Sequence, residues 1–188
     1  MFTQIALLLL KTAISLWVGL FLFRWYCLLI KLNLSQGVGQ FSHFIYKLTD
    51  WAVLPLRRVL PKFSQFDLAC FISAFLVQLA GILLQSLLLA GNFSPMHTLV
   101  LAFFELASSA LSGMTGLLII FALLSWINAN AEVFYFLDKL TQPFLSPVRK
   151  IVPPIAGIDI SILIVLVLLQ VVNIVLANLR VLLRVVEG

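Results

Sequence analysis

The chain has 188 residues, of which 63% are hydrophobic and only 10% are charged, and its mean hydropathy is +1.16. A soluble domain has about 25% charged residues, so this composition excludes an ordinary water-soluble domain and predicts a membrane protein. In such a protein the net charge of +5 reports orientation and lipid contact, and it gives no indication of nucleic-acid binding.

The first predicted element is a membrane-spanning helix over about residues 3–26. A helix needs about 20 apolar residues to cross a bilayer. The stretch lacks the basic start and the small-residue cleavage site of a secretory signal, so we expect it to be retained as a helix. A long connector follows, with an amphipathic segment over Phe41–Leu54 that we expect to lie at the membrane interface.

The next predicted elements are a second span over about 68–90 and a third within 97–127, joined by a short link without Lys or Arg. The third stretch is too long for one perpendicular span, and it fits either one tilted helix or a short interfacial helix followed by a span. A second long connector holds an amphipathic segment over Ala131–Leu145, and a fourth span covers about 160–183. All four stretches are continuously apolar, which favours helices over barrel strands and predicts an all-α membrane protein with four transmembrane helices.

The two long connectors and the spans after them carry the same motifs in the same order. Lys47-Leu48-Thr49 returns as Lys139-Leu140-Thr141, Pro55-Leu56-Arg57-Arg58-Val59-Leu60-Pro61 returns as Pro147-Val148-Arg149-Lys150-Ile151-Val152-Pro153, Asp67 returns as Asp159, and Gln78 returns as Gln170. The offset between the copies is constant. We therefore expect two tandem two-helix repeats, residues 1–92 and 93–188, each with one amphipathic interfacial segment.

The distribution of basic residues predicts the orientation of the chain in the membrane. The long connectors contain Lys31, Lys47, Arg57, Arg58, Lys62, Lys139, Arg149 and Lys150, whereas the short link contains none. The positive-inside rule then places both long connectors in the cytoplasm and both termini outside. Arg180 and Arg184 near the C-terminus oppose this orientation but are outnumbered.

The basic motif has two interpretations. Pro55 and Pro61, like Pro147 and Pro153, frame about one helical turn, because proline is tolerated in the first turn of a helix and stops a helix after its last turn. The cations between them, which are Arg57, Arg58, Arg149 and Lys150, either anchor the connectors at the interface or form a docking site for phospholipid or a partner. Arginine binds phosphate through a planar fork, which suits the second interpretation.

The polar residues around the second and fourth spans have structural and functional interpretations. Asp67 and Asp159 directly precede these spans, where they fit an N-cap, an ion pair with Arg57 or Arg149, or both. Gln78 and Gln170 lie about 16 Å further along, near the middle of a roughly 30 Å hydrocarbon core. They fit a hydrogen bond between the repeats or, together with Asn173, the polar lining of a permeation path.

The doubled pattern, with a span on each side, resembles the YGGT-repeat family of small integral membrane proteins over nearly the whole chain. The second copy departs from the first at Lys150, which replaces Arg58, and at Pro154, which replaces Lys62. The resemblance implies a bacterial inner-membrane protein of the kind often encoded near cell-division and cell-wall genes, with some members associated with osmotic-stress tolerance. Plastid relatives are tied to haem attachment to cytochrome b6 and to nucleoid partitioning. The resemblance implies no catalytic residues.

The chemistry-bearing residues favour a non-enzymatic role. The sequence contains no catalytic triad, phosphate-binding loop or metal-ligand cluster, and His43 and His97 are isolated, so we expect no enzyme activity, no metal and no cofactor. We expect a scaffold or assembly factor that docks membrane lipid, or a membrane or cell-envelope protein, through basic cytoplasmic segments. The alternative is a small ion channel or transport accessory linked to osmotic-stress tolerance. It would need a homo-oligomer, because four helices make a thin pore wall.

Overall fold

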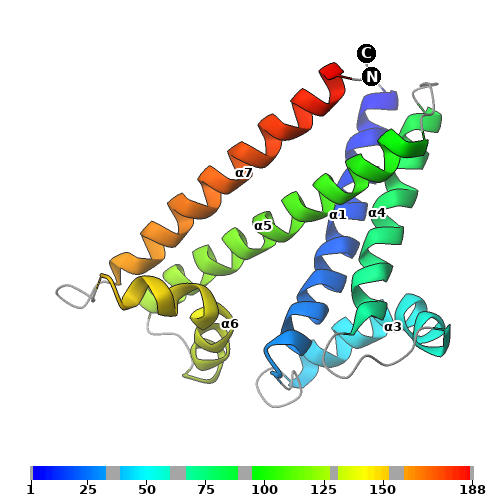
Figure 1. The fold of residues 1–188 in the computed structure, drawn as a ribbon. Helices are drawn as coiled ribbons and strands as arrows, with labels where there is room; N and C mark the ends of the chain where they lie inside the picture. Colours follow the sequence, from blue (N-terminus) through cyan, green and yellow to red (C-terminus); the bar gives the residue numbers. More distant parts are fainter. Residues whose placement is uncertain are drawn as a thin grey trace. The chain divides into compact units, whose positions relative to one another are not determined.

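The computed structural model describes residues 2–32, 39–59, 67–88, 95–127, 131–152 and 159–186, and these ranges contain helices and no strand (Figure 1). The helices are α1 (Phe2–Leu29), α3 (Gly39–Val59), α4 (Leu68–Leu88), α5 (Pro95–Ile127), α6 (Ala131–Arg149) and α7 (Ile160–Val186). The all-α prediction is confirmed.

Four of the helices, α1, α4, α5 and α7, are long and apolar enough to cross a membrane. Their candidate spans are Thr3–Leu29, Leu68–Leu88, Pro95–Ser125 and Ile160–Leu182. These bounds lie close to the predicted ones, because a continuous apolar run of bilayer length leaves few alternatives to a spanning helix. The prediction of four membrane-spanning helices is therefore confirmed at the level of length and composition.

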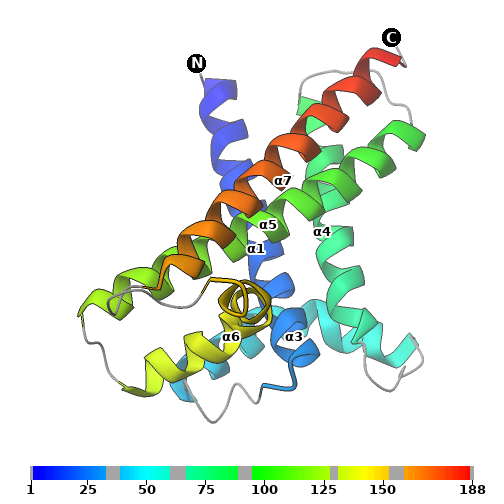
Figure 2. The same ribbon diagram turned by 60° about the vertical axis from the view of Figure 1, so that its left-hand side comes forward.

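α5 is one unbroken helix of 33 residues (Figure 2). At 1.5 Å per residue it extends for about 50 Å, well beyond a roughly 30 Å hydrocarbon core. The small and polar residues in its middle do not interrupt it, and Thr115 donates its hydroxyl hydrogen bond back to the carbonyl of Leu111, 2.8 Å away. The sequence left open a single tilted helix or a short interfacial helix followed by a span. The second of these arrangements is wrong, because the helix is continuous.

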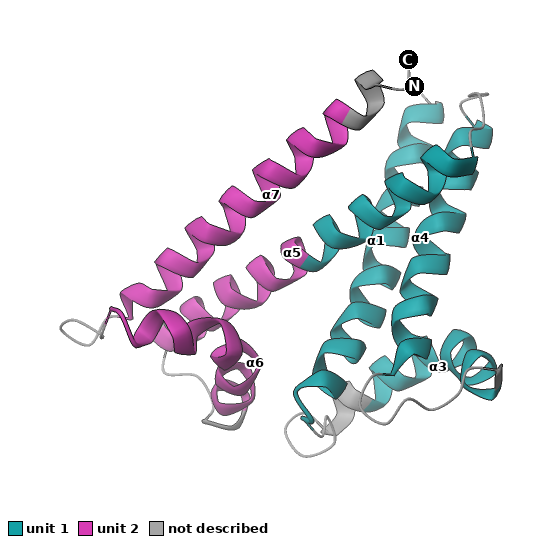
Figure 3. Cartoon of the chain, viewed as in Figure 1, with its two compact units in different colours: residues 1–35, 39–110 teal, residues 36–38, 111–188 magenta. Residues whose placement is uncertain are grey.

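The chain forms two compact units (Figure 3). One unit comprises residues 1–35 and 39–110, and the other comprises residues 36–38 and 111–188, so the division falls inside α5. The predicted repeats, 1–92 and 93–188, divide the sequence by its motifs, and they stay a prediction.

In the first unit, α1 and α4 lie side by side and α3 packs against both of them (Figure 1). Their core includes Phe21 on α1, Val53 on α3 and Ala74 on α4. Gly81 on α4 faces Ile14 on α1, where a Cβ would come within 2.5 Å of the Ile14 side chain. The absence of a side chain at Gly81 therefore allows the close approach of the two spans.

In the second unit, α6 packs against α7, and the rings of Phe121 on α5 and Phe134 on α6 stack at 5.2 Å. The residues of α6 that face inward in the second unit occupy the same motif positions as the residues of α3 that face inward in the first unit. The inward positions are Ile45, Thr49, Val53 and Leu56 on α3, and Leu137, Thr141, Leu145 and Val148 on α6, all of them buried or half-buried. Both amphipathic segments expected from the sequence are therefore helices with an inward face.

The prolines of the basic motif lie inside these helices. Pro55 is within α3, and Pro143 and Pro147 are within α6. The expectation that Pro55 and Pro147 start a separate helical turn is wrong, because near the end of a well-packed helix the loss of one backbone hydrogen bond does not end it. Pro61 and Pro153 lie outside the described residues.

Candidate functional site

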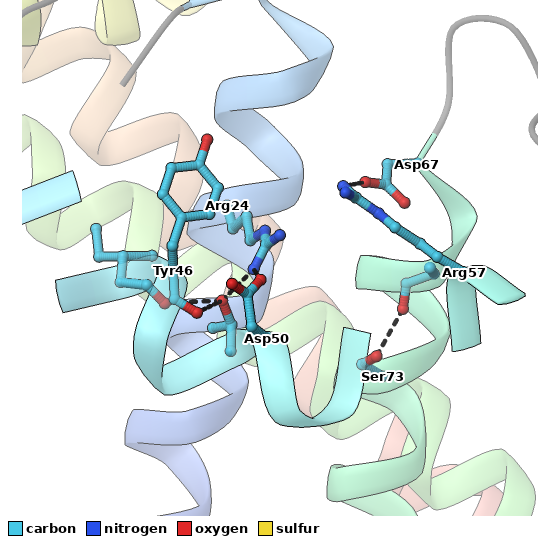
Figure 4. Close-up of polar contacts among 9 residues, drawn as sticks. Arg24, Tyr46, Asp50, Arg57, Asp67 and Ser73 are labelled. Carbon is cyan, nitrogen blue, oxygen red and sulfur yellow. Dashed lines mark hydrogen bonds and ion pairs between the residues drawn. The ribbon is translucent and has the colours of Figure 1, made fainter. Parts of the chain in front are cut away.

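One arginine of each basic motif is held by the aspartate that precedes the next span. In the first unit the guanidinium of Arg57 at the end of α3 is paired with Asp67 before α4 (Figure 4). In the second unit Arg149 at the end of α6 is paired with Asp159 before α7, with its Nε 2.8 Å and its NH2 2.6 Å from Oδ2. The structure thus forms the anticipated ion pair inside each copy of the motif, where it fastens the amphipathic helix to the following span.

Asp159 also caps α7. The backbone N–H of Ser161 donates to Asp159 Oδ1 at 3.1 Å, while the other carboxylate oxygen accepts from Arg149. Asp159 is therefore both the N-cap of α7 and the ion-pair partner of Arg149. In the first unit the backbone carbonyl of Asp67 accepts from the N–H of Cys70 at 3.2 Å.

These pairs divide the four cations of the motifs into two kinds. Arg57 and Arg149 are engaged, and the hydrogen bond to the Asp67 carboxylate raises the pKa of Arg57, which therefore stays charged at any physiological pH. Arg58 and Lys150 are exposed, and neither forms an ion pair with a residue that the structure describes. Only the second kind is available to an external anion.

A second polar cluster, around Arg24 near the end of α1, has no counterpart among the predicted site residues (Figure 4). Arg24 is only 2% exposed, and its NH1 lies 2.8 Å from Asp50 Oδ1 on α3. The same guanidinium donates to the hydroxyl of Thr49 and lies over the ring of Tyr46, 4.6 Å from its centroid. This cluster ties the amphipathic helix to the first span.

The repeated sequence motif marks one member of this cluster, Thr49, but not the ion pair. Thr49 closes the repeated Lys-Leu-Thr motif, and its hydroxyl donates to the carbonyl of Ile45 at 2.7 Å, as Thr141 does to Leu137 at 2.9 Å. The ion pair itself belongs to the first copy, because Gln142 stands at the position of Asp50. In the second copy Asp138 instead lies 3.5 Å from Arg149, on the same helix.

The three amides predicted to have a role within the membrane have different environments. Gln78 is buried in the first unit, Gln170 is exposed on α7, and Asn173 is half-buried. The hydrogen bond expected between Gln78 and Gln170 would join the two units, and it stays a prediction. Within the described residues, no group of three His, Cys, Asp or Glu side chains is arranged to hold a metal ion.

The double role of Asp159 leads to a prediction for stability. We expect Asp159→Asn, which keeps the cap but removes the charge, to lower the free energy of unfolding by about 1 kcal/mol, since the pair is partly exposed. Asp159→Ala removes the cap as well and should cost about 2 kcal/mol. Unfolding in detergent measures both, and equal losses for the two variants would contradict the cap.

Comparison with known proteins gives consistent results. The sequence model of the family described as CCB3/YggT matches residues 3–88 and 100–180. An "Uncharacterized protein in proC 3'region" of Vibrio alginolyticus is 32% identical, with 72% of this chain and 75% of the relative covered. "Uncharacterized protein YggT" of Escherichia coli K12 is 28% identical, with 72% of this chain and 71% of the relative covered. "Uncharacterized protein PA0392" of Pseudomonas aeruginosa is 29% identical, with 92% of this chain and 88% of the relative covered. No solved structure matches.

Proposed function

Since the chain belongs to the CCB3/YggT family, we propose that it is a non-enzymatic scaffold or assembly factor of the bacterial inner membrane. Its connectors would lie in the cytoplasm and both termini outside. The observation that carries the proposal is the pair of exposed cations, Arg58 and Lys150, each at the end of an amphipathic helix that is fastened to a span. A cation held in this way is presented in a fixed place at the membrane surface, where it can dock anionic lipid or a protein partner.

The arrangement supports docking more than anchoring alone. An anchor needs only positive charge near the headgroups, and any of the connector cations supplies it. Here the neighbouring arginine is neutralised by an aspartate in each motif, and that pair fixes the helix end from which Arg58 or Lys150 projects. One cation of each motif thus positions the helix, and the other stays available for binding.

The proposal predicts a loss of function on charge reversal at these two positions. We expect Arg58→Glu/Lys150→Glu to leave the folded protein in the membrane but to remove its bound partners and to impair growth under osmotic stress. The control is Gln142→Glu, which adds a negative charge at an exposed position of α6. Crosslinking in cells and growth in high salt are the measurements. If the double variant keeps the same crosslinked partners and the same growth as the unchanged protein, the docking proposal is wrong.

The alternative function, a small ion channel or transport accessory, rests on Gln78, Gln170 and Asn173. It requires flux of potassium or sodium through liposomes that contain the purified protein, and that flux should disappear in Gln78→Leu/Gln170→Leu. It also requires a homo-oligomer, which crosslinking would reveal as a concentration-dependent ladder.

A further inference from the structure

α3 carries a stripe of exposed apolar and basic side chains on one face. The stripe consists of Phe44, Lys47, Trp51, Leu54 and Arg58, whose alternating spacing of three and four residues keeps them on one side of a helix. Phe44, Trp51 and Leu54 are 57%, 61% and 50% exposed. Lys47 and Arg58 form no ion pair with any residue in the described ranges.

A contact between α3 and α1 places Trp51 of this stripe beside the apolar part of a span. Trp51 packs edge-on against Trp17 of α1, with the ring centroids 5.6 Å apart. Arg24 near the end of α1 is hydrogen-bonded to Thr49 on the inward face of α3. Trp17 lies seven residues before Arg24, and so about 10 Å closer to the middle of α1. The neighbouring Leu16 of α1 is exposed, as expected of a side chain that faces lipid. Trp51 therefore lies beside a part of α1 that exposes apolar side chains.

We propose that the stripe on α3 is a binding site for anionic phospholipid. Phe44, Trp51 and Leu54 enter the boundary between headgroups and acyl chains, and Lys47 and Arg58 bind the headgroup phosphates. Aromatic and aliphatic side chains flanked by Lys and Arg are typical of helices in that boundary, and each basic side chain adds attraction to an anionic surface. This inference rests on the proposed docking function and names lipid as what the α3 end of the protein docks.

The second copy of the motif lacks such a stripe. The equivalent positions on α6 are Phe136, Lys139, Pro143, Ser146 and Lys150. Phe136 is buried, a serine replaces Leu54, and Lys139 lies over the ring of Tyr135, 4.4 Å from its centroid. The cations are present, but Pro143 stands between them where α3 has Trp51, and the exposed aromatic ring of α6, that of Tyr135, lies outside the equivalent positions. α6 therefore serves as a comparison for α3, with cations at the same two positions and no exposed tryptophan or leucine between them.

The experiment uses the purified full-length chain in neutral detergent, titrated with phosphatidylglycerol or with phosphatidylcholine while its thermal unfolding is followed. A lipid that binds the folded state raises the unfolding midpoint. We expect phosphatidylglycerol to raise it at lower concentration than phosphatidylcholine. Lys47→Gln/Arg58→Gln should weaken the apparent affinity for phosphatidylglycerol roughly 30-fold. Lys139→Gln/Lys150→Gln should weaken it much less, because Pro143 stands on α6 where α3 has the exposed Trp51 between its cations. Trp51→Gln should weaken the response to both lipids.

Three results would overturn the inference. These are equal responses to the two lipids, equal losses in the α3 and α6 double variants, and a midpoint raised as much by inorganic phosphate as by phosphatidylglycerol. A crosslinked protein partner that is lost in Lys47→Gln/Arg58→Gln while the lipid response is unchanged would assign the stripe to that partner instead. The lipid titration uses purified protein, so its outcome is independent of the cell-based test of the proposed function. The lipid inference alone fails if lipid has no effect while charge reversal of Arg58 and Lys150 still removes partners. The docking proposal for cells alone fails if the lipid response is as expected while that charge reversal has no effect.

Discussion

Replacement of Asp50 by alanine is expected to lower the free energy of unfolding by about 3 kcal/mol, because it leaves Arg24 with an uncompensated charge in the interior. Arg24 is only 2% exposed, so water cannot take the place of the lost carboxylate. Its Nε already has no hydrogen-bond partner among the described residues. The Thr49 hydroxyl and the Tyr46 ring remain, but neither carries a negative charge.

Replacement of Arg24 and replacement of Asp50 should lower the free energy of unfolding by different amounts. Asp50 is 38% exposed, and water can solvate its carboxylate if Arg24 is removed. Arg24→Met should therefore cost less than Asp50→Ala, about 1 to 2 kcal/mol, and the double variant should recover part of the loss caused by Asp50→Ala.

Unfolding of the three variants in detergent gives the coupling between the two side chains. Gln142→Ala is the control at the same register of α6, where the side chain is exposed and the loss should stay under about 0.5 kcal/mol. A larger cost for Arg24→Met than for Asp50→Ala would show that the buried charge of Arg24 is not what Asp50 compensates.

The second large effect is expected at Gly81, where α1 and α4 approach each other. A Cβ at this position would lie 2.5 Å from Ile14 Cδ1 and 3.0 Å from Ile14 Cγ2. Because isoleucine is branched at Cβ, these atoms cannot all move away by rotation of one terminal bond. Gly81→Leu should lower the free energy of unfolding by about 3 kcal/mol, through overpacking between the spans.

A compensating change separates overpacking from other causes. Ile14→Ala makes room opposite position 81, so Gly81→Leu/Ile14→Ala should unfold at a higher temperature than Gly81→Leu alone. Gly113→Leu is the control, because a Cβ at Gly113 meets no atom within 4 Å, and it should have little effect. Equal destabilisation by Gly81→Leu and Gly113→Leu would indicate loss of glycine itself, and not contact with Ile14, as the cause.

Several features of the fold and of the candidate site follow from local sequence. A continuous apolar stretch must form a helix in a bilayer, since no water is present to satisfy its backbone groups, and this fixed the four spans. The spacing of Ile45, Thr49, Val53 and Leu56 fixed the inward face of α3. The Arg–Asp pairs were also within reach of sequence reasoning, because Arg57 and Asp67, like Arg149 and Asp159, flank one short connection.

Other features depend on which helices meet, and the sequence contains no local sign of that. Arg24 and Asp50 lie on different helices, and they pair only because α3 folds back against α1. The burial of Gln78 and the exposure of Gln170 follow in the same way from the neighbours of α4 and α7. The two copies of the motif carry cations at the same positions, yet only α3 has an exposed tryptophan, Trp51, between them. Local sequence determined the helices and their inward faces through backbone hydrogen bonding and periodicity. The tertiary structure decided which charges are paired and which apolar side chains of α3 stay exposed, because both depend on the helices that pack against one another.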